Sequence, residues 1–342
     1  MKQYPLFLFA ILLIISCAKE DNEPVALAIY DTTHTIDWMS DFLTKHADSD
    51  VTLRDISMPA AHDAGVYVLN NCNLGNACNT QTQYLNMTDM LASGIRVFDV
   101  RPVFKDGAFW TYHATNCNGL GCEGEDFTTF LQQTKDFLDR HNELVIFEVT
   151  HFCNTSPQDA VFLALLQDIL GDRIYKETTT SLVSFVDKPL DEVIPTNGDG
   201  GKIILLMEGL NDMTEDREEG FFAPSFIPLD GSYANRYIFD EMLSDQKAKF
   251  QGYDASNSEI FSMSYTLTLN DQLAVECVAE EEPSSSIESL SIDARNRLES
   301  TVDSWLADNT ITQGKIPHII YADYVNTTLT EQCIRISEFN IE

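Results

Sequence analysis

The chain has 342 residues, of which 44% are hydrophobic and 22% are charged, and this is the composition of a folded globular protein. It excludes disordered, collagen-like and coiled-coil classes. Only 21 Lys and Arg residues stand against 54 Asp and Glu residues, so the formal charge is −33 and nucleic-acid binding through a basic surface is also excluded. The length allows two domains, although one α/β barrel can use this much chain.

The N-terminus has the pattern of an export signal. Lys2 precedes an apolar run at residues 6–15, and Ser16 and Cys17 follow this run. The run is short for a membrane-spanning helix and predicts a signal peptide over residues 1–16. The residues that end at Cys17 resemble a bacterial lipobox, which implies cleavage before Cys17 and a lipid on that cysteine. We expect a tether over residues 17–36 and an extracytoplasmic, membrane-anchored bacterial lipoprotein on the outer membrane or cell surface. Plain secretion is the alternative.

Seven cysteines follow Cys17, and outside the cytoplasm they are expected to form disulfides. Two close pairs, Cys72 with Cys78 and Cys117 with Cys122, lie in segments rich in Asn and Gly and favour small disulfide-closed loops. Neither pair has the spacing of a zinc or CxxC redox motif. Because the number is odd, at least one thiol is left free or pairs outside the chain.

From residue 37 onward, helix-like and strand-like patterns alternate along the chain. Helices are predicted over residues 37–46, 86–92, 127–141, 157–170, 239–250 and 287–306. Strands are predicted over residues 55–58, 95–101, 108–113, 144–149, 202–207, 260–269 and 318–324, with a turn at residues 105–107 and an acidic, Ser-rich loop at residues 276–286. The first strand lacks a GxGxxG motif, so the alternation favours a closed parallel barrel over a dinucleotide-binding sheet. We therefore expect an α/β fold, an irregular TIM-type (β/α) barrel, as a single domain over residues 37–342.

Ionisable side chains stand at the ends of several predicted strands. They are His62 and Asp63, Asp99 and Arg101, His113, and Asp323. In a parallel barrel these ends meet at one mouth. Two histidines with carboxylates beside them can act as general base and general acid, and an arginine can bind phosphoryl oxygens with its guanidinium. The set predicts phosphodiester cleavage without a metal or another cofactor.

Two of these segments also carry a family resemblance. Residues 53–65 and 91–101 resemble the first two catalytic motifs of the X domain of phosphatidylinositol-specific phospholipases C, and residues 109–113 resemble the segment of its second catalytic histidine. The resemblance spans roughly residues 50–152. It implies a TIM-type barrel and a phosphoinositide or related phospholipid as the substrate. No protein partner is predicted. Animal relatives have an acidic calcium ligand where Arg101 stands, so the resemblance is to the metal-independent bacterial type.

Carried over residue by residue, the resemblance assigns roles to the residues at the strand ends. It implies that His62 is the general base supported by Asp323, and that His113 is the general acid supported by Asp63. Arg101 would stabilise the phosphate. Asp99 and Thr150 are expected in the substrate-binding site, with Asp99 as the partner of Arg101 or Arg96, whereas bacterial members tend to have an inositol-contacting lysine at the position of Thr150.

Other interpretations of the sequence remain open. A glycerophosphodiester phosphodiesterase or a sphingomyelinase-like enzyme would share the barrel, but the former needs a His-Arg-Gly metal motif that is not found here. A catalytically inactive lipoprotein that binds a headgroup or a glycan is favoured by Thr150 and by the Ala60, Ala61 and Ala64 that flank His62. Of the other histidines, His151 alone directly follows a predicted strand, so it either lines the mouth or has a supporting role.

Overall fold

The computed structural model describes residues 35–117, 119–154, 158–177, 183–194, 198–208 and 215–342. The predicted signal peptide, the proposed lipid site at Cys17 and nearly all of the predicted tether lie outside these residues. The α-helices are α1 (Trp38–Lys45), α2 (Met87–Ala92), α3 (Phe127–Leu138), α4 (Asp159–Leu170), α5 (Phe239–Gly252), α6 (Asp271–Ala279), α7 (Ile287–Ala307) and α8 (Thr327–Ile341).

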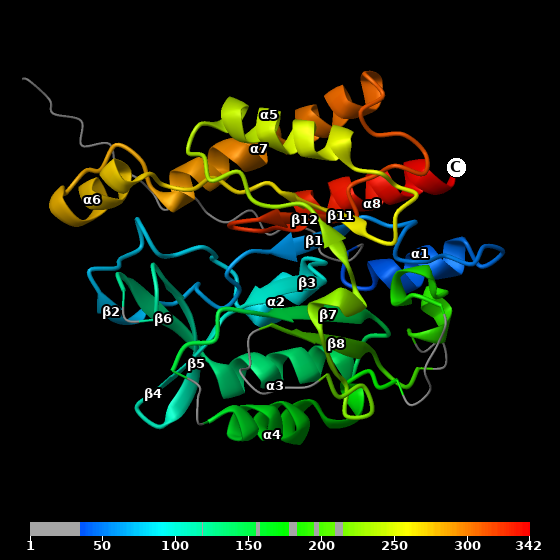
Figure 1. Cartoon of the computed structure of the whole chain (residues 1–342), viewed down its shortest axis with the longest axis horizontal. Coiled ribbons are helices and arrows are strands. Elements are labelled where there is room, and N and C mark those ends of the chain that lie inside the picture. The colour runs from blue at the N-terminus through cyan, green and yellow to red at the C-terminus, as the bar shows by residue number, and fades with distance from the viewer. Residues whose placement is uncertain (1–34, 118, 155–157, 178–182, 195–197, 209–214) are drawn as a thin grey trace, which may run out of the picture. The chain divides into compact units, whose positions relative to one another are not determined.

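The main sheet has eight strands that all run parallel, and it curls into a TIM-type barrel. In order across the sheet they are β10 (Leu229–Asp230), β11 (Ile260–Ser264), β12 (Ile319–Ala322), β1 (Met58–Ala61), β3 (Val97–Val100), β7 (Leu144–Val149), β8 (Lys202–Met207) and β9 (Phe221–Phe222). Helices α5, α7 and α8 pack on the outside of the curled sheet along one flank of the barrel, and α3 and α4 pack on the outside along the opposite flank (Figure 1). The α/β barrel fold predicted from the sequence is confirmed.

The barrel differs from the prediction in one respect, because hydrogen bonds do not close it. The outermost strands, β9 and β10, form no ladder with each other within the described part of the chain. Each has only two residues, and one turn of 3-10 helix, Pro224–Phe226, lies between them. Segments this short make too few backbone hydrogen bonds to complete a ring of strands.

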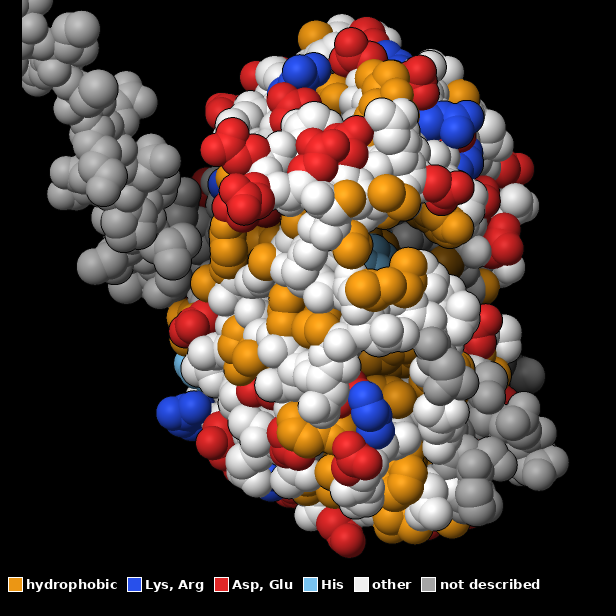
Figure 2. All heavy atoms as spheres, turned by 90° about the vertical axis from the view of Figure 1, so that its left-hand side faces the viewer, with side chains coloured by type: hydrophobic (Ala, Val, Ile, Leu, Met, Phe, Trp, Pro, Cys, Tyr) orange, Lys and Arg blue, Asp and Glu red, His pale blue; other side chains and the backbone are white. Residues whose placement is uncertain are grey.

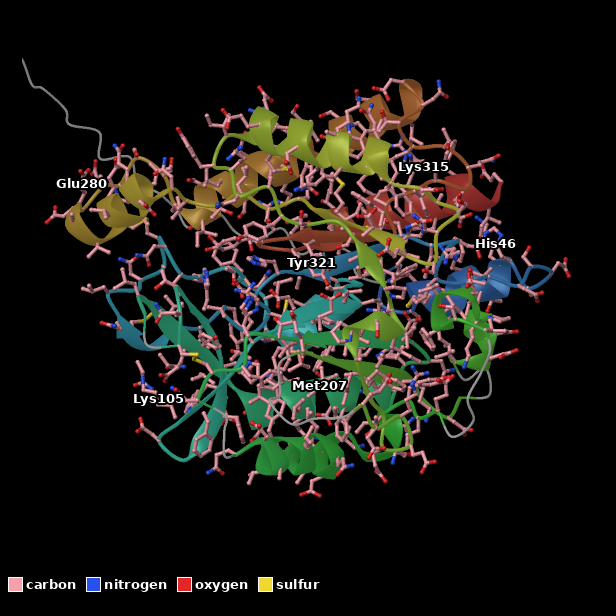
Figure 3. All side chains as sticks on the ribbon, in the orientation of Figure 1. His46, Lys105, Met207, Glu280, Lys315 and Tyr321 are labelled. Carbon is pink, nitrogen blue, oxygen red and sulfur yellow. A yellow bond between two sulfur atoms is a disulfide. The ribbon has the colours of Figure 1, made fainter. Side chains whose placement is uncertain are left out.

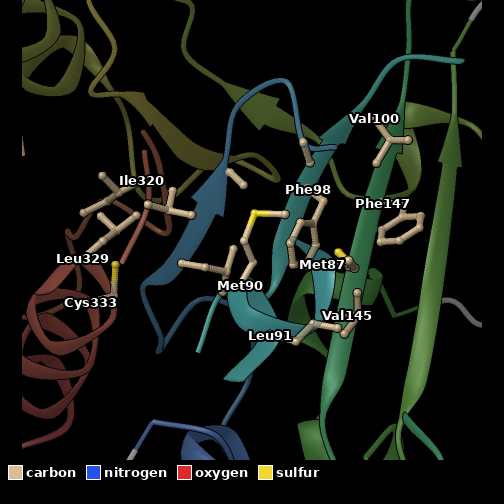
Figure 4. Close-up of a cluster of buried hydrophobic side chains, with 14 of the residues drawn as sticks. Met87, Met90, Leu91, Phe98, Val100, Val145, Phe147, Ile320, Leu329 and Cys333 are labelled. Atoms are coloured by element: carbon tan, nitrogen blue, oxygen red, sulfur yellow. The ribbon is translucent and has the colours of Figure 1, made fainter. Parts of the chain in front are cut away.

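Alternating side chains divide the apolar core into a layer outside the barrel and a layer inside it. Along β7, Val145, Phe147 and Val149 pack outward with the helices, whereas Leu144 and Ile146 pack inside the barrel. Figure 4 shows part of the outer layer, where side chains of α2 lie against Phe98 and Val145. The period of two along a strand therefore determines which side chains face the interior.

A second sheet, which is antiparallel, carries one of the predicted site residues. It has four strands in the order β2 (Asn70–Asn73), β6 (Gly121–Asp126), β5 (Ala108–Ala114) and β4 (Pro102–Lys105). The predicted turn joins β4 to β5, with Asp106 and Gly107 at φ values of 51° and 87°, as a two-residue hairpin turn requires. His113 therefore comes from a hairpin sheet beside the barrel and not from a barrel strand.

The disulfides differ from the expected small loops. Cys72 pairs with Cys122, Cys78 with Cys277, and Cys117 with Cys153, while Cys333 is free and buried. Cys72 and Cys122 belong to the adjacent antiparallel strands β2 and β6, which bring residues 50 positions apart into contact. The pairing thus follows the tertiary fold, and the prediction from spacing is wrong. The predicted free thiol is confirmed.

Several element boundaries also differ from the prediction. The first strand begins at Met58 and not at Asp55, whose carboxylate accepts hydrogen bonds from the backbone N–H and the hydroxyl of Thr52. The predicted loop 276–286 overlaps α6, which an Asn270 cap begins. Strands β2, β4 and β6 and helix α8 were not predicted. Within the described ranges, no helix has both the length and the apolar character needed to cross a membrane.

Candidate active site

A cavity of about 450 Å³ opens at the carboxyl ends of the parallel strands. Its walls include His62 and Asp63 after β1, Asp99 and Arg101 at the end of β3, and His113 from β5. In Figure 2, a histidine side chain is visible in a hollow that hydrophobic side chains surround. The strand ends predicted from the sequence therefore converge, as the barrel topology requires.

His62 is held from both its backbone and its ring. Its N–H donates to the Ala322 carbonyl at 3.1 Å, which continues the ladder between β1 and β12, and its Nδ1 lies 2.8 Å from Asp323 Oδ1. Burial opposes the charged imidazolium, but the carboxylates of Asp63 and Asp323 outweigh burial and raise the pKa of His62 to about 9. Asp323 thus orients the ring so that Nε2 faces the cavity.

Asp63 lies between the two histidines of the site. Its Oδ2 is 3.4 Å from His62 Nε2 and 3.6 Å from His113 Nε2, and its Oδ1 is 2.6 Å from Arg101 Nε. The residue has a positive φ of 45°, and the next N–H, that of Ala64, donates to the Asp99 carbonyl. Burial alone would raise the pKa of Asp63, but Arg101 and the histidines lower it to about 2. Asp63 is therefore ionised at neutral pH.

Arg101 connects the acidic groups with His62. Its Nη2 lies 2.8 Å from Asp99 Oδ2 and 3.1 Å from His62 Nε2. Although burial disfavours the guanidinium charge, Asp63 and Asp99 shift the pKa of Arg101 further above its usual range. A guanidinium N–H can donate to His62 only if Nε2 carries no proton, so this contact favours the neutral ring while the carboxylates favour the imidazolium.

His113 is positioned by a backbone carbonyl. Its Nδ1 lies 2.8 Å from the carbonyl oxygen of Thr80, so Nδ1 carries the donated hydrogen and Nε2 faces Asp63. Strand β5 reaches this position because Thr111 packs directly on Gly65, where a Cβ would lie only 2.6 Å from Thr111 Cγ2. The Thr111 hydroxyl also donates to the Gly65 carbonyl at 3.1 Å. This close contact brings β5, and with it His113, next to the segment that follows His62.

Comparison with known proteins supports the fold. No family model matches the chain, and no curated protein matches it in sequence. The phosphatidylinositol-specific phospholipase C from Listeria monocytogenes has a TM-score of 0.58 at 18% identity, over 88% of this chain and 98% of that one. The enzyme from Staphylococcus aureus has a TM-score of 0.57 at 14% identity, over 89% and 97%. The chain has the fold of bacterial phosphatidylinositol-specific phospholipases C. At these identities the likeness establishes the fold alone.

Thr150 connects two site residues. Its hydroxyl donates to Asp99 Oδ1 at 3.2 Å, so its oxygen accepts from His151 Nδ1–H at 2.8 Å. His151 has a positive φ of 50°, and its carbonyl accepts a hydrogen bond from the Tyr112 hydroxyl at 2.6 Å. Thr150 thus lines the cavity and supports the partner of Arg101, and His151 faces the same cavity.

One group in the site has donor atoms close enough to share a metal ion. Ligand atoms of His62, Asp63 and Asp99 lie within 4.8 Å of one another. However, the Arg101 guanidinium lies 2.6 Å from Asp63 and 2.8 Å from Asp99, in the space between these carboxylates. A cation could bind to all three residues only if Arg101 moved away, because its fixed charge already neutralises the carboxylates. The donor set therefore fits an arginine better than a metal.

The structure brings together the predicted site residues His62, Asp63, Asp99, Arg101, His113, Thr150 and Asp323. Cys17, the predicted lipidation site, lies outside the described residues. Sequence reasoning missed the Thr80 carbonyl, which no motif could reveal because a backbone atom makes the contact. It also missed Glu148 and Tyr321, which line the cavity. The charge of Glu148 within an otherwise apolar strand was a signal that could have identified it.

Proposed function

We propose that this protein cleaves the glycerol–phosphate bond of phosphatidylinositol or a related phospholipid, as a phosphorus–oxygen lyase. The observation that carries the proposal is the arrangement of two histidine Nε2 atoms on either side of the Asp63 carboxylate, with the Arg101 guanidinium 3.1 Å from one of them. Two proton-transfer groups and one fixed cation around a cavity are suited to displacement at a phosphodiester. The fold and the sequence motifs point to the same reaction.

In the proposed reaction, each histidine moves one proton. His62 Nε2 takes the proton from a headgroup hydroxyl next to the phosphate, and the hydroxyl oxygen forms a new bond to phosphorus. The bond from phosphorus to the glycerol oxygen breaks, and His113 gives a proton to this oxygen. The products are diacylglycerol and a cyclic phosphodiester of the headgroup, so atoms and charge balance without an added reactant.

The remaining polar groups orient these histidines and stabilise charge. Asp323 holds His62 by its Nδ1 and stabilises the imidazolium that forms when Nε2 takes a proton. Asp63 stabilises the charged form of His113 before this residue donates. Arg101 binds the non-bridging phosphate oxygens and takes the role that a metal ion has in metal-dependent phosphodiesterases. The proposed mechanism therefore requires no metal ion.

The proposed location is outside the cytoplasm, with the protein attached to a membrane through a lipid on Cys17. Three disulfides support an oxidising compartment, because such bonds are rare in the cytoplasm. A membrane anchor would place the enzyme at a lipid surface. Metabolic labelling with a radioactive fatty acid tests the anchor, and a Cys17→Ser chain that retains the label would contradict it.

The direct test of function is incubation with phosphatidylinositol, with and without EDTA, followed by phosphorus NMR. We expect inositol 1,2-cyclic phosphate in both samples. His62→Ala and His113→Ala should each reduce turnover at least ~100-fold, the usual contribution of a general acid or base, with unchanged circular dichroism. Loss of activity in EDTA that calcium restores would favour a metal-dependent phosphodiesterase. Tight headgroup binding without turnover would favour the inactive binding protein.

A further inference from the structure

One acidic side chain in the cavity has no role in the proposed mechanism. Glu148 lies on β7, in register with Asp99 of β3 and Leu206 of β8. Since Ile146, two residues earlier, packs inside the barrel, Glu148 also points inward and becomes part of the cavity wall. Tyr321, which is labelled near the centre of the barrel in Figure 3, lines the same cavity.

Glu148 lacks a partner that could neutralise it. Its Oε1 and the Tyr321 hydroxyl are both buried, and the Tyr321 hydroxyl is the one neighbouring group that stabilises the carboxylate. Arg101 is the only Lys or Arg among the described residues that line the cavity, and Asp63 and Asp99 already bind its guanidinium. Burial outweighs the Tyr321 hydroxyl, which lowers the pKa of Glu148, and with smaller contributions from Asp99 and Glu208 it raises this pKa to about 7. A buried carboxyl group without a cationic partner keeps acceptor capacity that a hydroxyl of a ligand can use.

The wall of the cavity around Glu148 offers hydroxyl groups and no further Lys or Arg among the described residues. Ser262 and Ser264 come from β11, Thr266 and Thr268 from the segment after it, and Ser232 from the segment after β10. Hydroxyls both donate and accept hydrogen bonds, so this wall is suited to a polar, uncharged group. An additional phosphate on this side of the cavity would meet the charges of Asp99, Glu148 and Glu208, while Arg101 is already bound by Asp63 and Asp99.

We propose that Glu148 determines headgroup specificity: its carboxyl group accepts a hydrogen bond from a hydroxyl of a polyol headgroup and excludes headgroups that carry a further phosphate. The proposal rests on the proposed function. It explains why an acid is placed in a cavity that must also hold an anionic phosphodiester, because Arg101 binds the phosphodiester while Glu148 contacts the uncharged part of the headgroup.

The test compares Glu148→Gln with the wild-type protein. We would measure kcat/KM for phosphatidylinositol and for its 3-, 4- and 5-monophosphates in the same mixed micelles. The wild type should prefer unphosphorylated phosphatidylinositol. Gln replaces a charged acceptor with a neutral one, so Glu148→Gln should lower kcat/KM for phosphatidylinositol by about 10-fold, the usual contribution of a hydrogen bond to a charged group. In the same variant, the ratio of kcat/KM for phosphatidylinositol to kcat/KM for at least one monophosphate should fall by more than 10-fold.

Glu208→Gln is the matched control. Glu208 is an exposed acid directly after β8 that contributes to the field at Glu148 but does not line the cavity. Glu208→Gln should change the same kcat/KM ratio by less than about twofold. The reason is that specificity is proposed to come from contact with the headgroup, and Glu208 contributes only a distant charge. An unchanged preference in Glu148→Gln, or an equal change in Glu208→Gln, would overturn the proposal.

A binding measurement separates this proposal from the proposed function. NMR titration with myo-inositol should show saturable shifts in the wild type and a Kd at least about 10-fold weaker in Glu148→Gln. If no phosphodiester is cleaved but this difference is found, the proposed function fails and the role of Glu148 stands. Equal binding by both proteins, no binding by the wild type, or a preference for ethanolamine or choline headgroups would each overturn the role of Glu148.

Discussion

The cavity places one ionised aspartate between two histidines and one arginine, so four groups of the site share their protons and charges. Asp63 is held ionised by Arg101 and the histidines, with a pKa of about 2, and it in turn helps to raise the pKa of His62. A change at one of these residues therefore alters the protonation of the others, as in any coupled set. Two expectations follow for individual side chains.

Arg101→Lys should reduce kcat about 10²–10³-fold, the usual loss when one donor that stabilises the transition state is removed. A lysine ammonium is a point charge and cannot reproduce the two guanidinium contacts, one to Asp63 and one to Asp99. Steady-state rates on phosphatidylinositol measure the effect. Arg140→Lys, an exposed substitution two residues after α3, serves as the control and should leave kcat unchanged. A kcat within threefold of the wild type in Arg101→Lys would contradict the assignment.

The pH dependence of kcat/KM should report His62. A general base must be unprotonated, and the carboxylates raise the pKa of His62 to about 9, so kcat/KM should rise between pH 7 and pH 9. Asp323→Asn removes one of the groups that raise this pKa and should shift the rise to lower pH. A rate that falls over the same range in the wild type would indicate that His62 donates the proton.

At the scale of secondary-structure elements, a buried ion pair fastens α1 to the barrel. Arg96, which precedes β3, and Glu143, which precedes β7, are both fully buried, with Nε and Oε2 2.7 Å apart. Glu143 also accepts hydrogen bonds from the backbone N–H groups of Met39 and Ser40 in the first turn of α1. The pair therefore connects α1 with the starts of β3 and β7, at the end of the barrel opposite the cavity.

Glu143→Gln should destabilise the protein by about 3–5 kcal/mol, because it leaves the Arg96 charge buried without its partner. Urea unfolding measures the change. Asp303→Asn breaks an exposed pair with Arg335 and should cost less than about 1 kcal/mol. If both substitutions lowered the free energy of unfolding by similar amounts, burial would not explain how much the Arg96–Glu143 pair contributes to stability.

The parts of the fold that the sequence predicted are those with strong local patterns. The apolar strand at residues 144–149 and the amphipathic helix that begins at Phe127 were predicted close to their observed bounds. The antiparallel strands β2 and β6 were missed because Asn, Cys and Gly dominate them and their pairing depends on distant residues. The histidines and Arg101 were found through motif spacing, whereas Thr80 contributes a carbonyl that the side-chain pattern does not encode.

For the whole molecule, the charge of −33 should oppose its approach to an anionic membrane. Salt screens such repulsion, over a Debye length of about 10 Å at 0.1 M. Hydrolysis of phosphatidylinositol vesicles by a chain without residues 1–23 should therefore increase as salt rises to about 0.15 M. Hydrolysis of a small soluble phosphodiester should change less under the same conditions. If the rate of vesicle hydrolysis instead fell steadily as salt rose, a local positive field and not the overall charge would govern how the protein approaches the membrane.

The disulfide between Cys78 and Cys277 joins residues 199 positions apart, and Cys78 is only two residues from Thr80, whose carbonyl positions His113. A bond that closes so long a loop strongly restricts the unfolded chain. It also holds the segment that orients the second histidine against α6, far along the chain. Before this bond forms, the Thr80 segment lacks that attachment, and we expect His113 to be oriented less firmly. Under the proposed export and function, the site would be completed only after export, and lipids on the cytoplasmic side would not be cleaved during synthesis of the protein.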